Sequence, residues 1–218
     1  MISTVIFDMD GVMIDSEPLW EKTERILLAR RNIDYSPDYR DKIVGLNQRD
    51  SGRLLVDTFN LAETVDEIIN ERISILTSIY ENELEVIPAL VPLLEQLEDE
   101  GYRLAVASSS PLRVVNFVLD MFSLHDHFLA VVSGESVGNG KPHPDIYIHT
   151  AETLGVTPAE CVAIEDSING LRSAKGAGMY CIAIPDKRLT AEQFRSADVI
   201  LGSLEELTPQ TIKSLGKP

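Results

Sequence analysis

The sequence has few cysteines and no long apolar segment. Its 218 residues include two cysteines, Cys161 and Cys181, which are too few and too far apart for a disulfide-rich scaffold or a zinc site. Both lie in short apolar runs, so we expect buried, unreactive thiols. No apolar run approaches the about 20 residues that a membrane-spanning helix needs. The start, MISTVIF, also lacks the basic residues and long apolar stretch of a signal peptide. We therefore expect a cytoplasmic protein.

Basic residues are also scarce. Lys and Arg together number 19 against 35 Asp and Glu, which gives a formal net charge of −16. Nucleic acids and anionic membranes attract basic surfaces, so this balance argues against both as partners. The length suits one domain, or one domain with a large insertion. We expect a monomer.

Short apolar runs separated by helical patterns indicate an α/β fold. The runs are continuous rather than alternating, which is typical of strands buried on both faces of a sheet. Leucines and valines repeat at helical spacing between them, for example in 90–97 and 114–119. This alternation predicts a doubly wound parallel sheet. The predicted strands are Val5–Phe7, Leu104–Ala107, Leu129–Val132, Cys161–Ile164, Cys181–Ile184 and Val199–Leu201.

Residues 15–87 interrupt the alternation directly after the first strand. This segment has helical patterns in 20–31 and 65–80 but no convincing strand, and Ser16 is placed to cap the first helix. An insertion at the carboxyl end of a strand stands over the edge where such sheets bind ligands. We therefore predict a helical cap domain over 15–87, inserted into a catalytic core of residues 1–14 and 88–218.

Two carboxylates, Asp8 and Asp10, follow the first strand in the run FDMDGV. Neighbouring carboxylates at the end of a buried strand repel each other unless a cation or a shared proton compensates them. A solvated loop is one alternative. A helix–loop–helix calcium loop is another, but it needs an oxygen ligand at its fifth position, where this chain has Val12, and no strand before it. We favour a chemical role for both aspartates.

Polar residues also follow the later strands. Ser108 and Ser109 precede a helix, where hydroxyl and backbone N–H groups either bind an anion or cap the helix. Lys141 is isolated in the sequence, and a solvated charge is its alternative interpretation. Glu165 and Asp166 follow the fourth strand and fit either a helix cap or a metal site.

These residues are expected to meet, because the carboxyl ends of parallel strands share one edge of a sheet. If the first strand is central and the second and fourth flank it, Asp8, Ser108 and Asp166 converge there. Two or three carboxylates bind Mg²⁺ through oxygen atoms and leave ligand positions for water and a phosphate oxygen. Lys141 and the hydroxyl groups would complete a site for a phosphoryl group.

In order and setting, these segments resemble the four motifs of the haloacid dehalogenase superfamily. The motif residues are Asp8–Val12, Ser108, Lys141-Pro142 and Glu165-Asp166. Residues 8–17, 140–147 and 164–178 are especially similar to the sugar-phosphatase and β-phosphoglucomutase branch, whose helical cap lies between the first and second motifs. The resemblance covers nearly the whole chain and implies a Rossmann-like core with an inserted cap.

The resemblance also implies roles for the motif residues. Asp8 would be the nucleophile that forms an aspartyl-phosphate, and Asp10 would protonate the leaving alkoxide and then activate water. Ser108 and the backbone N–H of Ser109 would bind phosphoryl oxygens, while Lys141 would offset negative charge beside Asp8. Dehalogenases and phosphonatases of the superfamily lack a carboxylate at the position of Asp10, which favours phosphate esters here.

The same resemblance implies a bound Mg²⁺. Its ligands would be the Asp8 carboxylate, the carbonyl oxygen of Asp10 and the Asp166 carboxylate. Glu165 would either ligate the ion or orient a water molecule.

The cap is expected to select the substrate. Candidate contacts are Glu17 and Trp20 on its first helix and Gln48 and Arg49 in the turn 45–49; core packing is the alternative for Trp20 and a solvated charge for Arg49. In β-phosphoglucomutases an arginine in this turn binds the non-transferring phosphate, whereas alignment places Gln48 there and shifts Arg49 by one position. Those mutases also have a basic residue on the first cap helix, where this chain has Leu19-Trp20.

We therefore expect an Mg²⁺-dependent phosphatase of a small phosphorylated metabolite, a sugar or polyol phosphate, that works through Asp8 and closure of the cap. A β-phosphoglucomutase-type phosphosugar mutase is the alternative, because it uses the same covalent step but must hold a bisphosphate at both ends. A receiver-type phosphorylation switch fits less well, since receivers carry the phosphorylated aspartate after a later strand and have no cap.

Overall fold

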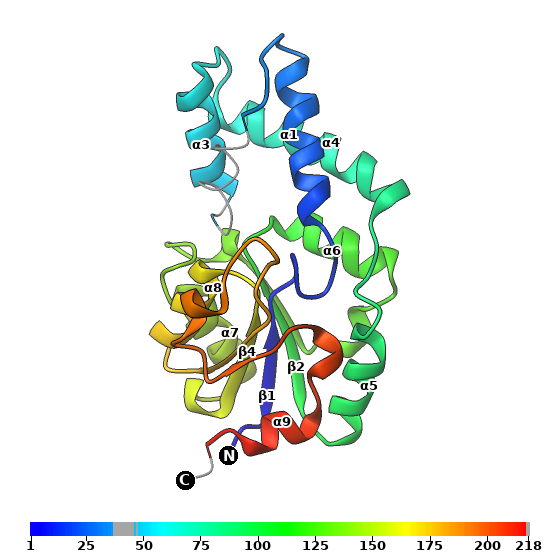
Figure 1. The fold of residues 1–218 in the computed structure, drawn as a ribbon, viewed down its shortest axis with the longest axis vertical. Helices are drawn as coiled ribbons and strands as arrows, with labels where there is room; N and C mark the ends of the chain where they lie inside the picture. The colour runs from blue at the N-terminus through cyan, green and yellow to red at the C-terminus, as the bar shows by residue number, and fades with distance from the viewer. Residues whose placement is uncertain (37–45, 47, 217–218) are drawn as a thin grey trace.

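A computed structural model of the chain describes residues 1–36, 46 and 48–216. Within these residues, a six-stranded parallel sheet has the order β3-β2-β1-β4-β5-β6 (Figure 1). The strands are β1 (Thr4–Phe7), β2 (Arg103–Ser108), β3 (Ala130–Ser133), β4 (Cys161–Glu165), β5 (Tyr180–Ala183) and β6 (Val199–Ile200). The first strand is central between β2 and β4, so the predicted doubly wound sheet is confirmed.

Helices cover both faces of this sheet. They are α5 (Leu90–Asp99), α6 (Leu112–Met121), α7 (Asp145–Leu154), α8 (Ile168–Gly176) and α9 (Pro209–Ser214). Alternate residues of a strand point to opposite faces. Val5 and Phe7 therefore join the apolar core with α5 and α6, while Ile6 joins the core with α7 and α8. With both faces covered, the ends of the strands are the places left for a ligand.

Each predicted strand differs from the observed strand by one residue at one or both ends, and burial accounts for two of these differences. β3 begins at Ala130 rather than Leu129, whose 66% exposure shows that it is not part of the buried sheet. β6 is limited to Val199 and Ile200, neither of which is buried, and it pairs only with β5. An edge strand keeps one side in solvent, so it does not need the continuous burial expected from the sequence.

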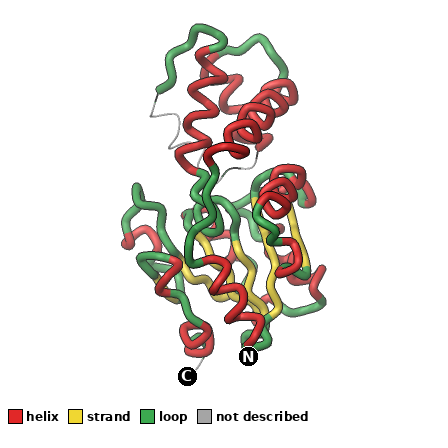
Figure 2. The backbone as a smooth tube through the Cα atoms, turned by 90° about the vertical axis from the view of Figure 1, so that its right-hand side faces the viewer, coloured by secondary structure: helices red, strands yellow, loops and turns green. Residues whose placement is uncertain are grey.

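A second group of helices stands over the carboxyl edge of the sheet (Figures 1 and 2). It comprises α1 (Glu17–Ala29), α3 (Gln48–Phe59) and α4 (Val65–Glu83), with α4 packed against both other helices. The two chain segments that join it to the sheet run side by side. Ile14 bridges to Val86, and the Asp15 N–H donates to the Glu85 carbonyl at 3.1 Å. The helical insertion predicted after β1 is thus present.

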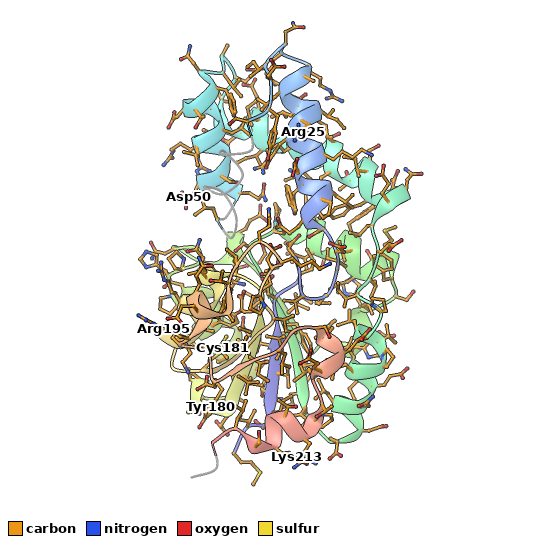
Figure 3. All side chains as sticks on the ribbon, viewed as in Figure 1. Arg25, Asp50, Tyr180, Cys181, Arg195 and Lys213 are labelled. Atoms are coloured by element: carbon orange, nitrogen blue, oxygen red, sulfur yellow. The ribbon has the colours of Figure 1, made fainter. Side chains whose placement is uncertain are left out.

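The two cysteines are free and buried, Cys161 in β4 and Cys181 in β5, where Figure 3 shows Cys181 within the core. Burial raises the pKa of the Cys161 thiol to about 11, so this thiol stays protonated and unreactive near neutral pH. The prediction of buried thiols is confirmed. Among the described residues, no helix is long and apolar enough to cross a membrane.

Candidate active site

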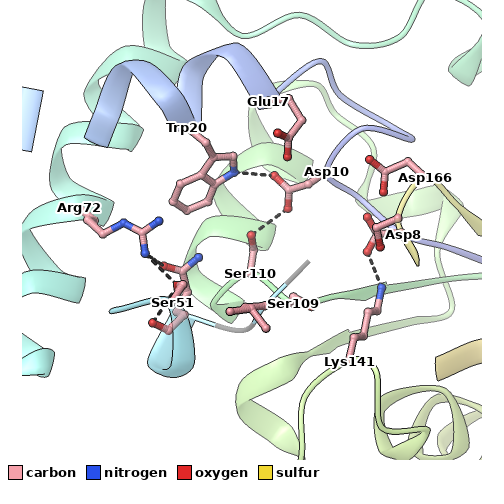
Figure 4. Close-up of a pocket in the computed structure, with 13 residues that line it drawn as sticks. Asp8, Asp10, Glu17, Trp20, Ser51, Arg72, Ser109, Ser110, Lys141 and Asp166 are labelled. Carbon is pink, nitrogen blue, oxygen red and sulfur yellow. Dashed lines mark hydrogen bonds and ion pairs between the residues drawn. The ribbon is translucent and has the colours of Figure 1, made fainter. Parts of the chain in front are cut away.

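The carboxyl ends of β1, β2 and β4 meet beneath the cap helices. The parallel register sets Phe7 level with Val106 and Ile164, so the polar residues that follow these strands emerge together. They border a pocket between sheet and cap (Figure 4). The described residues that line it are Asp8, Asp10, Glu17, Trp20, Leu46, Gln48, Ser51, Arg72, Ser109, Ser110, Lys141, Asp166 and Ser167.

Lys141 joins two buried carboxylates in this pocket. Its Nζ donates to Asp8 Oδ1 and to Glu165 Oε1, each at 2.6 Å, and to the Ala107 carbonyl at 3.1 Å. The Tyr147 hydroxyl donates to the same Glu165 oxygen at 2.6 Å. The side chain of Lys141 is 2% exposed, which excludes its interpretation as a solvated charge. Burial also strengthens these contacts, because water no longer screens them.

Burial and mutual repulsion set the protonation of this cluster. Burial raises the pKa of Asp8 to about 8, although Lys141 opposes the shift. Burial, together with the charges of Asp8 and Glu165, holds the pKa of Asp166 well above its usual range. Burial would lower the pKa of Lys141, but Asp8 and Glu165 raise it above its ordinary value. The single positive charge of Lys141 therefore does not balance the negative charges that the surrounding carboxyl groups would carry when ionised.

Three of these acids are placed to hold a metal ion. Oxygen atoms of Asp8, Glu165 and Asp166 lie within 4.8 Å of one another. Two glycines make room for them: a Cβ atom at Gly11 would lie 2.2 Å from Asp166 Oδ2, and one at Gly170 would lie 1.8 Å from Glu165 Oε2. Carboxylate oxygens suit a hard divalent cation, and its charge would balance the excess that Lys141 leaves. The residues present therefore fit a divalent metal.

The alternative that Glu165 and Asp166 cap a helix does not hold. Ser167 is the N-cap of α8, and its hydroxyl accepts a hydrogen bond from the Gly170 N–H at 3.0 Å. Both acids are instead buried, Glu165 completely. Their side chains are thus available to the cluster rather than to the helix.

Asp10 is held by donors from the cap side and from the loop after β2. Ser16 Oγ and Trp20 Nε1 donate to its Oδ1 at 2.7 and 3.0 Å, and Ser110 Oγ donates to its Oδ2 at 2.8 Å (Figure 4). Ser16 does occupy the N-cap position of α1, but its side chain makes no cap hydrogen bond, because the hydroxyl is directed to Asp10. These donors fix the direction of the Asp10 carboxylate.

The serines after β2 have separate positions. Ser108 is fully buried; its Oγ accepts from the Ser110 N–H at 3.0 Å and lies 3.5 Å from Asp10 Oδ2. Ser109 and Ser110 line the pocket. Sequence reasoning missed Ser110, although it belongs to the same serine run. Ser108 thus contacts both the turn and Asp10, while the next two serines line the pocket.

Comparison with known proteins identifies the family. The profile of the family described as Haloacid dehalogenase-like hydrolase matches residues 5–184. The chain belongs to this family. The resemblance inferred from the motifs is therefore confirmed, and with it the prediction of a hydrolase.

Known proteins resemble this chain over nearly its whole length. Hexitol phosphatase B of Escherichia coli (strain K12) is 35% identical over 222 residues, covering 97% of this chain and 96% of that protein. The structure of CbbY from Rhodobacter sphaeroides in complex with phosphate has a TM-score of 0.84 and 29% identity, covering 95% of this chain and 96% of that one. β-Phosphoglucomutase from Clostridium difficile has a TM-score of 0.86 at 23% identity and covers 98% and 96%, which supports the fold alone.

The cap side of this haloacid dehalogenase-type pocket is partly as predicted. Glu17, Trp20 and Gln48 line it. Arg49 lies instead along a neighbouring cleft, where it is 68% exposed and pairs with Asp66 at 3.6 Å. Of the turn 45–49, Gly45 and Asn47 lie outside the described residues.

Sequence reasoning missed Arg72, which enters the pocket from α4. Its Nη2 donates to Glu24 Oε1 at 2.8 Å, and its Nη1 donates to Ser51 Oγ at 2.9 Å and to Gln48 Oε1 at 3.3 Å. The guanidinium also lies over the Trp20 ring, 5.1 Å from its centre. Arg72 and Glu24 are at most 2% exposed, so they form a buried ion pair inside the cap.

A signal for this pair is present in the sequence. Arg72 lies four residues after Ile68 and four before Leu76, on the apolar face of α4, and both neighbours are fully buried. Positions at this spacing share one face of a helix. A charged residue in such a stripe indicates a buried partner, and Glu24 stands among Trp20, Leu27 and Leu28 in the same way.

Proposed function

We propose that the chain is an Mg²⁺-dependent phosphatase that hydrolyses a sugar or polyol monophosphate through an aspartyl-phosphate on Asp8. The observation that carries this proposal is the 2.6 Å contact of Asp8 with Lys141 inside a group of buried carboxylates suited to a divalent cation. A lysine keeps the attacking oxygen and the incoming phosphoryl group from repelling each other. Similarity to Hexitol phosphatase B over nearly the whole chain supports the substrate class.

In the first step, a carboxylate oxygen of Asp8 attacks the phosphorus atom and the bond from phosphorus to the ester oxygen breaks. Asp10 gives its proton to the leaving oxygen, which a positioned acid accelerates by about 10²–10⁴-fold. Ser16, Trp20 and Ser110 keep the Asp10 carboxyl group aimed at that oxygen.

In the second step, Asp10 accepts a proton from water, whose oxygen attacks the phosphorus atom of the aspartyl-phosphate. The bond between phosphorus and the Asp8 oxygen breaks, inorganic phosphate forms, and Asp8 is regenerated as a carboxylate. The N–H of Ser109, the Ser108 hydroxyl and Lys141 bind the phosphoryl group. Mg²⁺ held by Asp8, Asp166 and the carbonyl oxygen of Asp10, with Glu165 as ligand or support, would supply positive charge to the phosphoryl oxygens.

We further propose that residues 15–87 act as the cap and residues 1–14 and 88–218 as the catalytic core. The paired segments at Ile14 and Val86 would form the hinge between them. Glu17, Trp20 and Gln48 would contact the part of the substrate that carries no reacting phosphate, because they line the pocket from the cap side.

The charges in the pocket favour a phosphatase over the mutase alternative. Among the described residues that line it, the cationic side chains are Arg72 and Lys141. Each is already paired with a buried carboxylate, Arg72 with Glu24 and Lys141 with Asp8. A bisphosphate held at both ends needs a second unpaired cation, whereas a monophosphate does not.

A phosphate-release assay tests the proposal. With Mg²⁺ present, we expect phosphate release from hexitol and hexose monophosphates, loss of release on adding EDTA, and loss of release in Asp8→Asn. Asp57→Asn is the matched control, since Asp57 is an exposed aspartate on α3. β-Glucose 1-phosphate with a bisphosphate primer is assayed in parallel. Isomerisation faster than phosphate release would identify a mutase, and full turnover by Asp8→Asn would contradict the mechanism.

A further inference from the structure

An ion pair joins the first turn of the cap to a loop of the core. Arg188, in the loop after β5, donates from Nη2 to Glu17 Oε2 at 2.6 Å. Glu17 is the first residue of α1 and lines the pocket. The contact therefore links a substrate-facing position of the cap to a part of the core far away in the sequence.

The loop holds the Arg188 guanidinium in a fixed place. Asp186 Oδ1 accepts from Nε and from the backbone N–H of Arg188, each at 2.8 Å, and its Oδ2 accepts from Nη2 at 3.2 Å. The backbone N–H of Asp186 in turn donates to the carbonyl oxygen of Asp166 at 3.2 Å. Arg188 is thus anchored through Asp186 to Asp166, a member of the carboxylate cluster, and Glu17 is held relative to that cluster.

Glu17 lies where a carboxylate is repelled by its surroundings. Figure 4 shows it above Asp10, and Asp8 and Asp166 line the same pocket. Carboxylates that line one pocket repel one another. The ion pair with Arg188 at 2.6 Å offsets this repulsion.

We propose that Arg188 is a positioning residue for substrate recognition, which holds Glu17 so that its carboxylate accepts a hydrogen bond from a hydroxyl group of the substrate's carbon chain. The inference rests on the proposed phosphatase function and specifies what this pocket selects. An ionised carboxylate only accepts hydrogen bonds. It therefore favours a polyol or sugar monophosphate and disfavours an ester that carries its own carboxylate.

The single tryptophan of the chain, Trp20, lines the pocket, so its fluorescence provides a binding measurement that does not need turnover. The Kd values of sorbitol 6-phosphate and inorganic phosphate are measured with Mg²⁺ in an Asp8→Asn background. Glu17→Gln and Arg188→Gln should each raise the Kd of sorbitol 6-phosphate about five-fold more than the Kd of inorganic phosphate, as expected for a partly exposed ion pair. Arg188→Lys keeps the positive charge but loses the planar guanidinium group, so its Kd for sorbitol 6-phosphate should lie between those of the parent and Arg188→Gln.

The double variant Glu17→Gln/Arg188→Gln separates positioning from an independent effect. If Arg188 acts through Glu17, the double variant binds sorbitol 6-phosphate no more weakly than Glu17→Gln alone. Phosphoglycolate, which carries a carboxylate, should bind more weakly than sorbitol 6-phosphate, and Glu17→Gln should narrow that difference. Arg195→Gln is the matched control, because Arg195 forms an exposed ion pair with Glu192 at 3.4 Å on the outer side of the core (Figure 3).

Two results would overturn the role of Arg188. One is an additive loss in the double variant; the other is an equal loss for sorbitol 6-phosphate and inorganic phosphate, which would indicate a merely structural contact. A separate result bears on the proposed function. If the parent chain binds sorbitol 6-phosphate with the expected dependence on Glu17 and Arg188 but releases no phosphate from it, the phosphatase proposal fails and the positioning role stands.

Discussion

The core and the cap each contain a buried cation paired with carboxylates, but the two are positioned by different structures. Lys141 lies between Asp8 and Glu165 at the ends of strands, whose register is fixed by the backbone hydrogen bonds of the sheet. Arg72 meets Glu24 at 2.8 Å where α4 packs on α1. Helix packing tolerates shifts that strand register does not. We therefore expect the core to fix the chemistry and the cap to set the substrate.

The largest effects should come from removing the two buried cations. Lys141→Gln and Arg72→Gln each leave a buried carboxylate without its partner, which costs about 3–5 kcal/mol of unfolding free energy. Only Lys141→Gln should also lower kcat, by roughly 10²-fold or more, because it removes charge from the reacting group. Denaturant unfolding and steady-state kinetics with sorbitol 6-phosphate measure both.

A double variant shows whether the cap pair is structural. Glu24→Gln/Arg72→Gln leaves no uncompensated charge, so it should recover most of the stability lost in Arg72→Gln. A loss of kcat in this double variant as large as that of Lys141→Gln would contradict the division between core chemistry and cap selection.

Substitution of Trp20 should have an intermediate effect, because this cap residue donates a hydrogen bond to Asp10 of the core. Trp20→Phe keeps the ring beneath Arg72 but removes the N–H that donates to Asp10. A hydrogen bond to a charged group contributes about 1.5–3 kcal/mol, and two other donors remain, so we expect kcat to fall about ten-fold. Trp20→His, which keeps a ring N–H, should lose less. Equal loss in both variants would argue that packing, not the hydrogen bond, is responsible.

The pH dependence of stability should distinguish the core cluster from the cap. The pKa of Asp8 is raised from 3.8 to about 8, so the folded protein without metal retains a proton that the unfolded chain releases. Its unfolding free energy should therefore fall as the pH rises from about 4 to about 8. Mg²⁺ competes with that proton, and the stabilisation that it adds should grow over the same range.

Thermal unfolding between pH 5 and 9, with and without Mg²⁺, measures this effect. Asp8→Asn should flatten both trends, while Glu24→Gln/Arg72→Gln should keep them. A stabilisation by Mg²⁺ that does not change with pH would argue against Asp8 as a ligand.

The smallest effect is expected at Arg49. Its side chain is 68% exposed, and its contact with Asp66 at 3.6 Å is an exposed pair, which contributes little. Arg49→Gln should change kcat/KM for sorbitol 6-phosphate by less than about two-fold. A large rise in KM would show that this arginine reaches the substrate after all.

The core could be predicted from the sequence because parallel strands place their ends at one edge. Once β1 is central, the residues that follow β1, β2 and β4 must be neighbours, and Asp8, Ser109 and Asp166 line one pocket. The sequence pattern did not show which partner each side chain faces. The hydroxyl of Ser16 donates to Asp10 and does not accept from the first turn of α1. The backbone angles of Ser16 are helical (φ −92°, ψ −17°), whereas a capping serine has an extended backbone.

The cap was harder to predict for a physical reason. Which arginine faces the pocket depends on how α3 and α4 rotate against α1, and neighbouring positions on one helix point in different directions. The position of Arg49 in the motif therefore points to it as a substrate contact, whereas Arg72 lies inside an apolar stripe of α4 that indicates core packing. The sequence signal that distinguishes the two arginines is the place of Arg72 within an apolar stripe at helical spacing. In the structure, Arg72 is 2% exposed and Arg49 is 68% exposed.

The most direct test of the central claim is to identify the group that carries the phosphoryl intermediate. The enzyme is mixed with Mg²⁺ and sorbitol 6-phosphate, quenched in acid during turnover and treated with borohydride, which reduces an acyl phosphate to an alcohol. Peptide mass spectrometry should find reduction at Asp8 and nowhere else, and none in Asp8→Asn. Phosphate release accompanied by reduction at another carboxylate, or full turnover with Asp8 replaced, would contradict an aspartyl-phosphate on Asp8.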